Sequence, residues 1–252
     1  MQVEIKIIVI SVWFLLLFVA ERRFPAIATH FTGQNTARLG RNGSFWLVNS
    51  LLSLSIILPL TQLASENAIW QRQANGGISM LLLDILLLEI WIYWWHRANH
   101  RLPFLWRFHQ VHHLDAHLDS TSAIRFHSGE VVLSALARAG LIILLAIPFH
   151  HVLLFEMLIL LHTVFHHSNI RVPQKLETAL DWVVITPSVH RMHHHNIRAD
   201  TDSNYGTIFS VWDRLFRSRN TGKFTPDMQI GVENAKEKSL GKLWKLPFIS
   251  QD

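Results

Sequence analysis

The chain of 252 residues contains no cysteine. Disulfides, iron–sulfur clusters and thiolate zinc sites are therefore excluded. Charged residues make up only 16% of the chain and hydrophobic residues 50%, which indicates an integral membrane protein rather than a soluble one. The formal net charge of +5 is moderate. Beside long apolar runs, this excess of Lys and Arg indicates membrane topology and anionic headgroups, and we expect no nucleic-acid partner.

Three apolar runs, residues 5–20, 44–63 and 78–95, have about the length of membrane-spanning helices. At about 1.5 Å per residue, each approaches the ~30 Å thickness of the hydrocarbon layer. The first run could instead be a signal peptide, but it lacks a preceding basic stretch and a clean small-residue cleavage site, which favours a retained helix. A fourth apolar region, residues 131–161, is broken at Pro148 and its neighbours. The break predicts a helical hairpin, either fully spanning or re-entrant.

Basic residues predict the orientation of these helices. The loop at residues 21–43 carries four arginines, whereas the loop at residues 64–77 has Arg72 alone, so the first loop is placed in the cytoplasm. Three spans then bring the chain to the cytoplasmic face at His96, and the hairpin returns to that face. We therefore predict an all-α, multi-pass integral membrane protein. It should have three transmembrane helices plus a helical hairpin, and a cytoplasmic, histidine-rich helical cap.

Histidine is far more frequent than usual, with seventeen in the chain. Ten of these form four tight clusters: His96 and His100 in HRANH; His109, His112 and His113 in HQVHH; His162 and His166 in HTVFH; His190, His193 and His194 in HRMHH. On a helix, residues at i, i+3 and i+4 project from one face, so each cluster can aim its imidazoles at a common point. A closed tetrahedral ion needs about four ligands, so ten histidines predict a two-metal site. Imidazole-only ligation suits iron, zinc or copper, and argues against magnesium and calcium.

Several neighbouring residues are candidates for supporting roles. Glu89 lies on the same helical stripe as the first cluster, where it could hold a ligand imidazole in its metal-binding tautomer or face a neighbouring helix. His127, followed by Glu130 in RFHSGE, is interpreted as an outer hydrogen-bonding residue, with an eleventh ligand or a packing residue as alternatives. His167 follows His166 directly and could compete with it as a ligand. Three acids flank the clusters and are by default solvated loop residues: Asp115, Asp119 and Asp181.

The motifs together resemble those of the fatty acid hydroxylase/sterol desaturase superfamily of membrane di-iron oxygenases. The resemblance covers about residues 80–217, in the order HRANH, HQVHH, RFHSGE, HTVFHH, ITPSVHRMHHH, DSNYG and VWDRLF. It implies two iron ions held by the ten clustered histidines, with zinc as a substitute in purified protein. The characteristic Asn-Tyr-Gly falls on Asn204, Tyr205 and Gly206, and the first two are further candidates for supporting the site. Residues 216–218 read Phe-Arg-Ser where many members have Phe-Gly-Thr, a departure that touches no ligand.

The resemblance further implies O2-dependent oxidation of C–H bonds in a membrane lipid, and we favour hydroxylation over desaturation. Because no cytochrome b5 domain is fused to the chain, a separate electron-donor protein is expected. The lipid would enter from the bilayer and the active site would face the cytoplasm. The expected division is residues 1–77 for the N-terminal transmembrane helices and their loops, 78–218 for the membrane-embedded, fatty acid hydroxylase-like catalytic domain, and 219–252 for a polar tail.

Two other functions remain as alternatives. The first is a membrane metal transport or storage protein that uses the histidine clusters. A transporter should place polar ligands along a path through the membrane, whereas these clusters are predicted to gather at one face. The second is a zinc hydrolase, but the chain has no HEXXH, and HRANH lacks the glutamate that would activate water.

Overall fold

A computed structural model describes residues 3–28, 33–72, 77–222 and 224–249 of the chain. Across these residues the fold is helical, with three isolated β-bridges and no strand, which confirms the all-α prediction. The α-helices are α1 (Val3–Arg23), α2 (Gly33–Leu52), α3 (Leu58–Glu66), α4 (Gly77–Arg101), α5 (Pro103–His113), α6 (Ser128–Leu145), α7 (Phe149–His167), α8 (Gln174–Leu180), α9 (Pro187–His193), α10 (Arg198–Thr201), α11 (Val211–Leu215) and α12 (Leu240–Lys245). Two 3₁₀ turns (Ser122–Ile124 and Leu246–Phe248) and a π-helical turn (Ser53–Ile57) complete the helical elements described.

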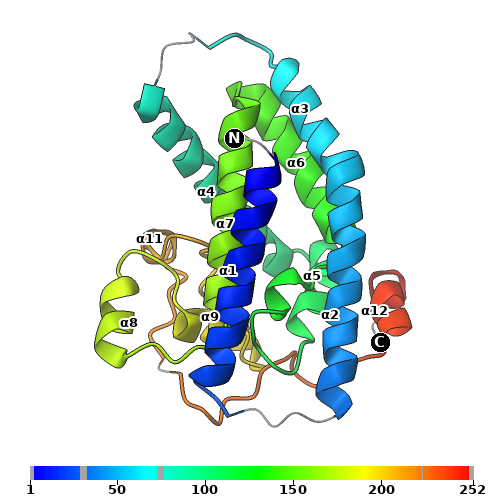
Figure 1. Cartoon of the computed structure of the whole chain (residues 1–252), viewed down its shortest axis with the longest axis vertical. Helices are drawn as coiled ribbons and strands as arrows, with labels where there is room; N and C mark the ends of the chain where they lie inside the picture. The colour runs from blue at the N-terminus through cyan, green and yellow to red at the C-terminus, as the bar shows by residue number, and fades with distance from the viewer. Residues whose placement is uncertain (1–2, 29–32, 73–76, 223, 250–252) are drawn as a thin grey trace.

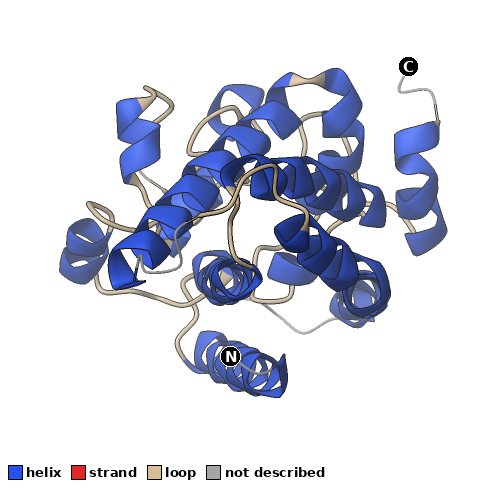
Figure 2. Ribbon diagram, turned by 90° about the horizontal axis from the view of Figure 1, so that it is seen from above, coloured by secondary structure: helices blue, strands red, loops and turns tan. Residues whose placement is uncertain are grey.

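The long helices form an elongated bundle, and the short helices gather toward its lower end (Figure 1). α2 continues through the π-helical turn into α3, and this helix packs along α6. α1 packs on α7 at the periphery of the bundle, as the view along the bundle in Figure 2 makes clear. We call the lower end, which carries α5 and α9, the histidine end. The histidine clusters identified in the sequence all lie at this end of the bundle.

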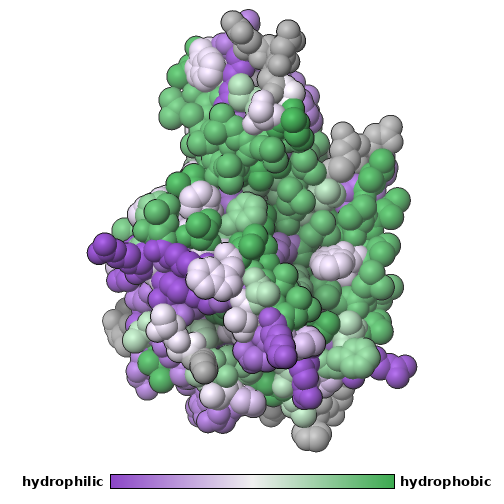
Figure 3. Space-filling model, turned by 90° about the vertical axis from the view of Figure 1, so that its left-hand side faces the viewer, coloured by the Kyte–Doolittle hydropathy of each residue, from purple (hydrophilic) through white to green (hydrophobic). Residues whose placement is uncertain are grey.

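Four helices are long and apolar enough to cross a membrane by length and composition: Thr36–Glu66, Gly77–Arg101, Ser128–Leu145 and Phe149–His167. Most of their side chains are not buried inside the protein, and Figure 3 shows hydrophobic residues covering the upper part of the molecule. Because an apolar surface of this extent is stable in lipid rather than in water, the prediction of a multi-pass membrane protein is confirmed. α1 has a similar exposed apolar face, and its role as a further span stays a prediction.

The helix that contains the second predicted span begins at Gly33, well before residue 44. The extra turns lie outside the apolar run and were therefore predicted as part of the loop at residues 21–43. Arg38 is in fact buried and pairs with Asp115 (Nε to Oδ1, 2.5 Å) and with Asp119 (Nη1 to Oδ2, 2.8 Å). The interpretation of Asp115 as a solvated loop acid was therefore wrong. This ion network ties α2 to the segment that follows α5.

The predicted helical hairpin is confirmed as α6 and α7. The chain reverses at Ala146, which adopts a left-handed backbone conformation (φ 52°), and Pro148 then precedes the first turn of α7 with an extended backbone. Ile142 and Phe155, one from each half, pack with Leu88 of α4 in a core cluster. Each half is long enough to cross the hydrocarbon layer, which favours a fully spanning hairpin over a re-entrant one.

The segment predicted as a polar tail, residues 219–252, packs against the rest of the chain where it is described. Leu243 of α12 is fully buried against Phe45 and Val111, so the tail closes a small hydrophobic core at the histidine end. Upstream, the Gly231 N–H donates to the carbonyl of His194. The predicted division into three segments stays a prediction.

Candidate metal centre

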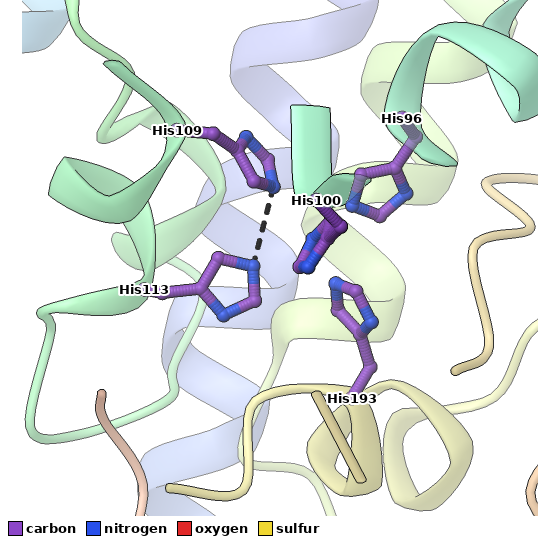
Figure 4. Close-up of side chains that lie close together, drawn as sticks. All are labelled: His96, His100, His109, His113 and His193. Carbon is purple, nitrogen blue, oxygen red and sulfur yellow. Dashed lines mark hydrogen bonds between the residues drawn. The ribbon is translucent and has the colours of Figure 1, made fainter. Parts of the chain in front are cut away.

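Nine buried or half-buried histidines converge at the histidine end in two adjacent groups. Group one consists of His96, His100, His109, His113 and His193, and group two of His112, His167, His190 and His194. Within each group, one ring nitrogen from every residue lies within 4.8 Å of the others. Figure 4 shows the rings of group one pointing toward a common centre from three separate stretches of ribbon. Eight of the ten histidines predicted as ligands fall in these groups, and His167 is the ninth member.

Helical periodicity explains how two short helices serve both groups. In α5, His109 and His113 are one turn apart and face group one, while His112 lies on the neighbouring stripe and faces group two. The arrangement is reversed around α9. There His190 and His194 face group two and His193 faces group one. The remaining histidines come from the C-terminal ends of two long helices, α4 for group one and α7 for group two. The short helices α5 and α9 contribute to both groups.

The ring nitrogens within each group are unusually close to one another. Nε2 of His109 lies 3.2 Å from Nε2 of His113, and Nε2 of His167 lies 3.0 Å from Nε2 of both His112 and His190. Both ring nitrogens of His100 are buried with no hydrogen-bond partner among the described residues. Crowded and unpartnered nitrogen atoms are unfavourable in a core unless a cation shares their lone pairs. The donor set therefore fits two metal ions.

Burial also sets the protonation state of these rings. Desolvation, followed by repulsion from neighbouring imidazoles, holds the pKa of His112, His113 and His194 well below the usual value of a histidine. Desolvation likewise lowers the pKa of His193, to about 3. These imidazoles are neutral at pH 7, which is the form that binds metal.

Hydrogen bonds to Nδ1 orient most of the rings. Backbone carbonyls accept from Nδ1 of His96, His112, His167 and His193, the acceptors being those of Tyr205, Arg125, Thr163 and Ser203. A carbonyl can only accept, so Nδ1 carries the proton and Nε2 keeps its lone pair for the centre of the group. In the same way, Oε1 of Glu130 lies 2.8 Å from Nδ1 of His109. Glu130, a candidate for a supporting role, thus contacts a ring of group one.

The Asn-Tyr-Gly segment forms a tight loop beside group one. Asn204 adopts a left-handed conformation (φ 52°), and a Cβ added at Gly206 would lie 2.8 Å from both Oδ2 of Asp213 and the carbonyl of Phe209, so only glycine fits. The buried Asp213 accepts the N–H groups of Tyr205 and Gly206 at 2.7 and 2.8 Å, and its pKa is raised by burial. Asp213 thus fixes the loop whose Tyr205 carbonyl orients His96.

Asp213 was not predicted as a supporting residue, although its motif VWDRLF carries part of the resemblance. The alternation of bulky and charged residues around it is also typical of a segment lying on a membrane surface. Only its position in the sequence, a few residues after Asn-Tyr-Gly, could have indicated its role.

Two other supporting candidates make contacts different from those expected. Glu89 bonds no imidazole of the described residues. Its Oε1 accepts the N–H groups of Ile208 and Phe209 at 2.8 and 2.9 Å, so it fastens the same loop to α4. His127 caps α6 by accepting the Gly129 N–H, and its other ring nitrogen contacts the carbonyl of Trp244. His127 therefore joins α6 to the C-terminal segment, outside both histidine groups.

His162 and His166, the remaining predicted ligands, lie outside the two groups. Nε2 of His162 contacts the carbonyl of Ile185 at 2.8 Å, and Nδ1 of His166 contacts that of Thr207 at 3.0 Å. The ring centre of His166 still lies only 4.0 Å from that of His190. At the end of α7 the side chain that reaches group two is His167, whose position on the helix lies about 100° further round than that of His166.

The part of the chain that carries both histidine groups also matches a known protein family. Residues 81–218 match the family model described as fatty acid hydroxylase. The chain therefore belongs to the fatty acid hydroxylase family, within the fatty acid hydroxylase/sterol desaturase superfamily, and the predicted resemblance is confirmed.

Three relatives illustrate the family. Ornithine lipid hydroxylase OlsE of Rhizobium tropici is 26% identical over 67% of the chain and 50% of its own length. Alkylglycerol monooxygenase of Danio rerio is 30% identical over 66% of the chain and 35% of its own length. Lathosterol oxidase of Mus musculus is 29% identical over 56% of the chain and 46% of its own length. The chain thus spans half or less of each relative. No solved structure matches the chain.

Proposed function

We propose that the protein is an oxygen-dependent lipid oxidoreductase that hydroxylates a C–H bond of a membrane lipid at a di-iron centre. The observation that carries the proposal is the pair of adjacent, buried, all-histidine groups at one end of apolar helices. The relatives support it, because they are named lipid hydroxylase, alkylglycerol monooxygenase and sterol oxidase. Two of these three names describe insertion of oxygen, which favours hydroxylation over desaturation. None of them supports metal transport or storage.

Each group would hold one ion. The five histidines of group one exceed a closed tetrahedral shell and suit a metal of higher coordination number, such as iron. Two nitrogens bound to one ion at about 2.1 Å with a right angle between them lie about 3.0 Å apart, close to the spacings in group two. His166 is the candidate for a fifth ligand of group two, whereas His162 would have to give up its contact with Ile185.

Bound iron would supply the activation of O2 that oxidation of an unactivated carbon requires. The chain's own residues have three tasks around it. Glu130 and the backbone carbonyls hold the imidazoles in the ligating tautomer. Asp213 and Glu89 fix the loop that lies over group one. The packed ends of the long helices would keep bulk water away from the histidine groups, whose rings are almost all buried.

We further propose that the histidine end faces the cytoplasm and that a separate protein supplies the electrons. The proposed orientation rests on the arginines of residues 21–43, at the ends of α1 and α2 that lie on this side of the bundle (Figure 1).

The test is anaerobic purification of the protein with iron, followed by metal analysis and lipid mass spectrometry. We expect about two ions per chain and, with O2 and a reductant, a lipid product heavier by one oxygen. A loss of two hydrogens instead would identify a desaturase. Less than one iron per chain after careful reconstitution, together with no O2 uptake, would rule out the proposal.

A further inference from the structure

A cavity lies at the histidine end, apart from the two histidine groups. Its volume is about 360 Å³, and its walls come from the end of α1, the start of α2, the segments after α5 and α7, α9 and residues 226–230. Polar and charged side chains make up about half of this wall, among them Glu21, Arg38, Asp119, Asn169 and Arg191, and apolar side chains make up the rest. A cavity lined in this way suits a ligand that carries a polar group beside apolar atoms.

Both carboxylates in the wall are already committed within the protein. Glu21 accepts from the backbone and hydroxyl of Ser120, from the N–H of Asn169 and from Arg22. Asp119 accepts two hydrogen bonds from the guanidinium of Arg38 and two from Thr121. Arg38 in turn shares its remaining donors between Asp115 and its neighbours. The negative charge of this wall is therefore compensated before any ligand binds.

Arg191 differs from these residues because its charge is not compensated by a partner of opposite charge in the described part of the chain. Its side chain is only 3% exposed, and it forms no ion pair among the described residues. Its hydrogen bonds both use Nη2 and go to neutral oxygens, the carbonyl of Leu118 (3.1 Å) and Oδ1 of Asn169 (3.2 Å). Its Cζ also lies 5.4 Å from the ring of Phe224. A buried guanidinium with donors to spare at a cavity wall is costly unless an anion completes it.

We propose that this cavity binds an oxyanion, a phosphate group, through Arg191. The planar guanidinium presents donors that match such a group, and charge-assisted hydrogen bonds of this kind are the stronger ones. The oxyanion belongs either to a lipid headgroup or to a soluble molecule. Glu21 follows the apolar run of α1 directly, which places the cavity at headgroup level if α1 spans the membrane. The proposal does not depend on the proposed reaction.

The test measures binding to the full-length, metal-loaded protein in a nonionic detergent by native mass spectrometry. The probes are phosphatidylglycerol, diacylglycerol with the same chains, sn-glycerol 3-phosphate and inorganic phosphate. We expect one phosphate-bearing probe to bind at least about tenfold more tightly than diacylglycerol, and Arg191→Gln to remove about tenfold in affinity. Binding of phosphatidylglycerol alone identifies a lipid headgroup, and binding of the free phosphates identifies a soluble ligand.

Arg171→Gln is the matched control, because it removes the same charge from an exposed position after α7. Since Arg191 lies between two histidines of the metal groups, metal content is measured in every variant. Should Arg191→Gln lose metal or fail to fold, Met228→Trp decides, because it fills the cavity without a change of charge and is expected to abolish binding. The proposal is overturned if no phosphate-bearing probe binds preferentially, or if the cavity variants bind as well as Arg171→Gln.

Discussion

At the scale of single residues, Glu130 is, among the residues that the structure describes, the carboxylate closest to a ring of the two histidine groups. Its Oε1 contacts Nδ1 of His109 and accepts from the amide of Asn99. We expect Glu130→Gln to lower iron affinity about 10- to 100-fold, because the neutral amide makes the imidazole a weaker ligand. Competition with a chelator of known affinity measures the change. Glu66→Gln, an exposed substitution at the other end of the bundle, is the control, and equal affinities of the two variants would contradict the expectation.

Asp115 should make stability depend on acidity. Burial alone would raise the pKa of its carboxyl, but the guanidinium of Arg38 overcomes this and holds the pKa well below the usual value. A depressed pKa in the folded state contributes stability above the usual pKa of about 3.9, and that stability is lost as the pH falls further. The melting temperature of Asp115→Asn should therefore lie below that of the native protein at pH 5–7, by a margin that shrinks below about pH 4. A margin independent of pH would contradict this.

At the scale of elements, the last turn of α7 decides which histidine completes group two. We expect His167→Ala to lose about one of two ions, because the other three histidines of this group leave its ligand shell incomplete. His162→Ala should keep both ions, since that ring contacts the carbonyl of Ile185 instead. Metal analysis of the two purified variants provides the comparison. Retention of both ions by His167→Ala, with loss in His162→Ala, would contradict this expectation and identify His162 as a ligand.

The sequence predicted most of the helices and left their rotation and supporting contacts open. Apolar runs near the length of a membrane span are enough to predict the helices around residues 44–63 and 78–95 and the hairpin at Pro148. On α7, however, adjacent histidines at 166 and 167 lie on different stripes of the helix, and only packing against α9 selects between them. Contacts such as that of Asp213 with the Asn-Tyr-Gly loop arise in three dimensions and have no periodic signature.

At the scale of the whole molecule, the absence of cysteine allows the orientation to be measured directly. Glu66, at the end of α3, and His117, in the segment after α5, are exposed. The end of α3 and the segment after α5 lie toward opposite ends of the bundle (Figure 1). In Glu66→Cys, a membrane-impermeant maleimide should label intact cells. In His117→Cys, it should label only permeabilised cells, because the arginine-rich side is expected in the cytoplasm. The unsubstituted chain is the control for background. The opposite labelling pattern would place the histidine end outside.

The close-packed neutral imidazoles have a consequence for the life of the protein in a cell. A chain that has folded without metal keeps several mutually repelling nitrogen lone pairs in its interior, and its folded state is penalised accordingly. If the proposed iron centre forms, iron supply should govern how much of the protein survives proteolytic quality control, as well as how fast each copy works. Scarcity of the metal would first appear as a falling abundance of the protein.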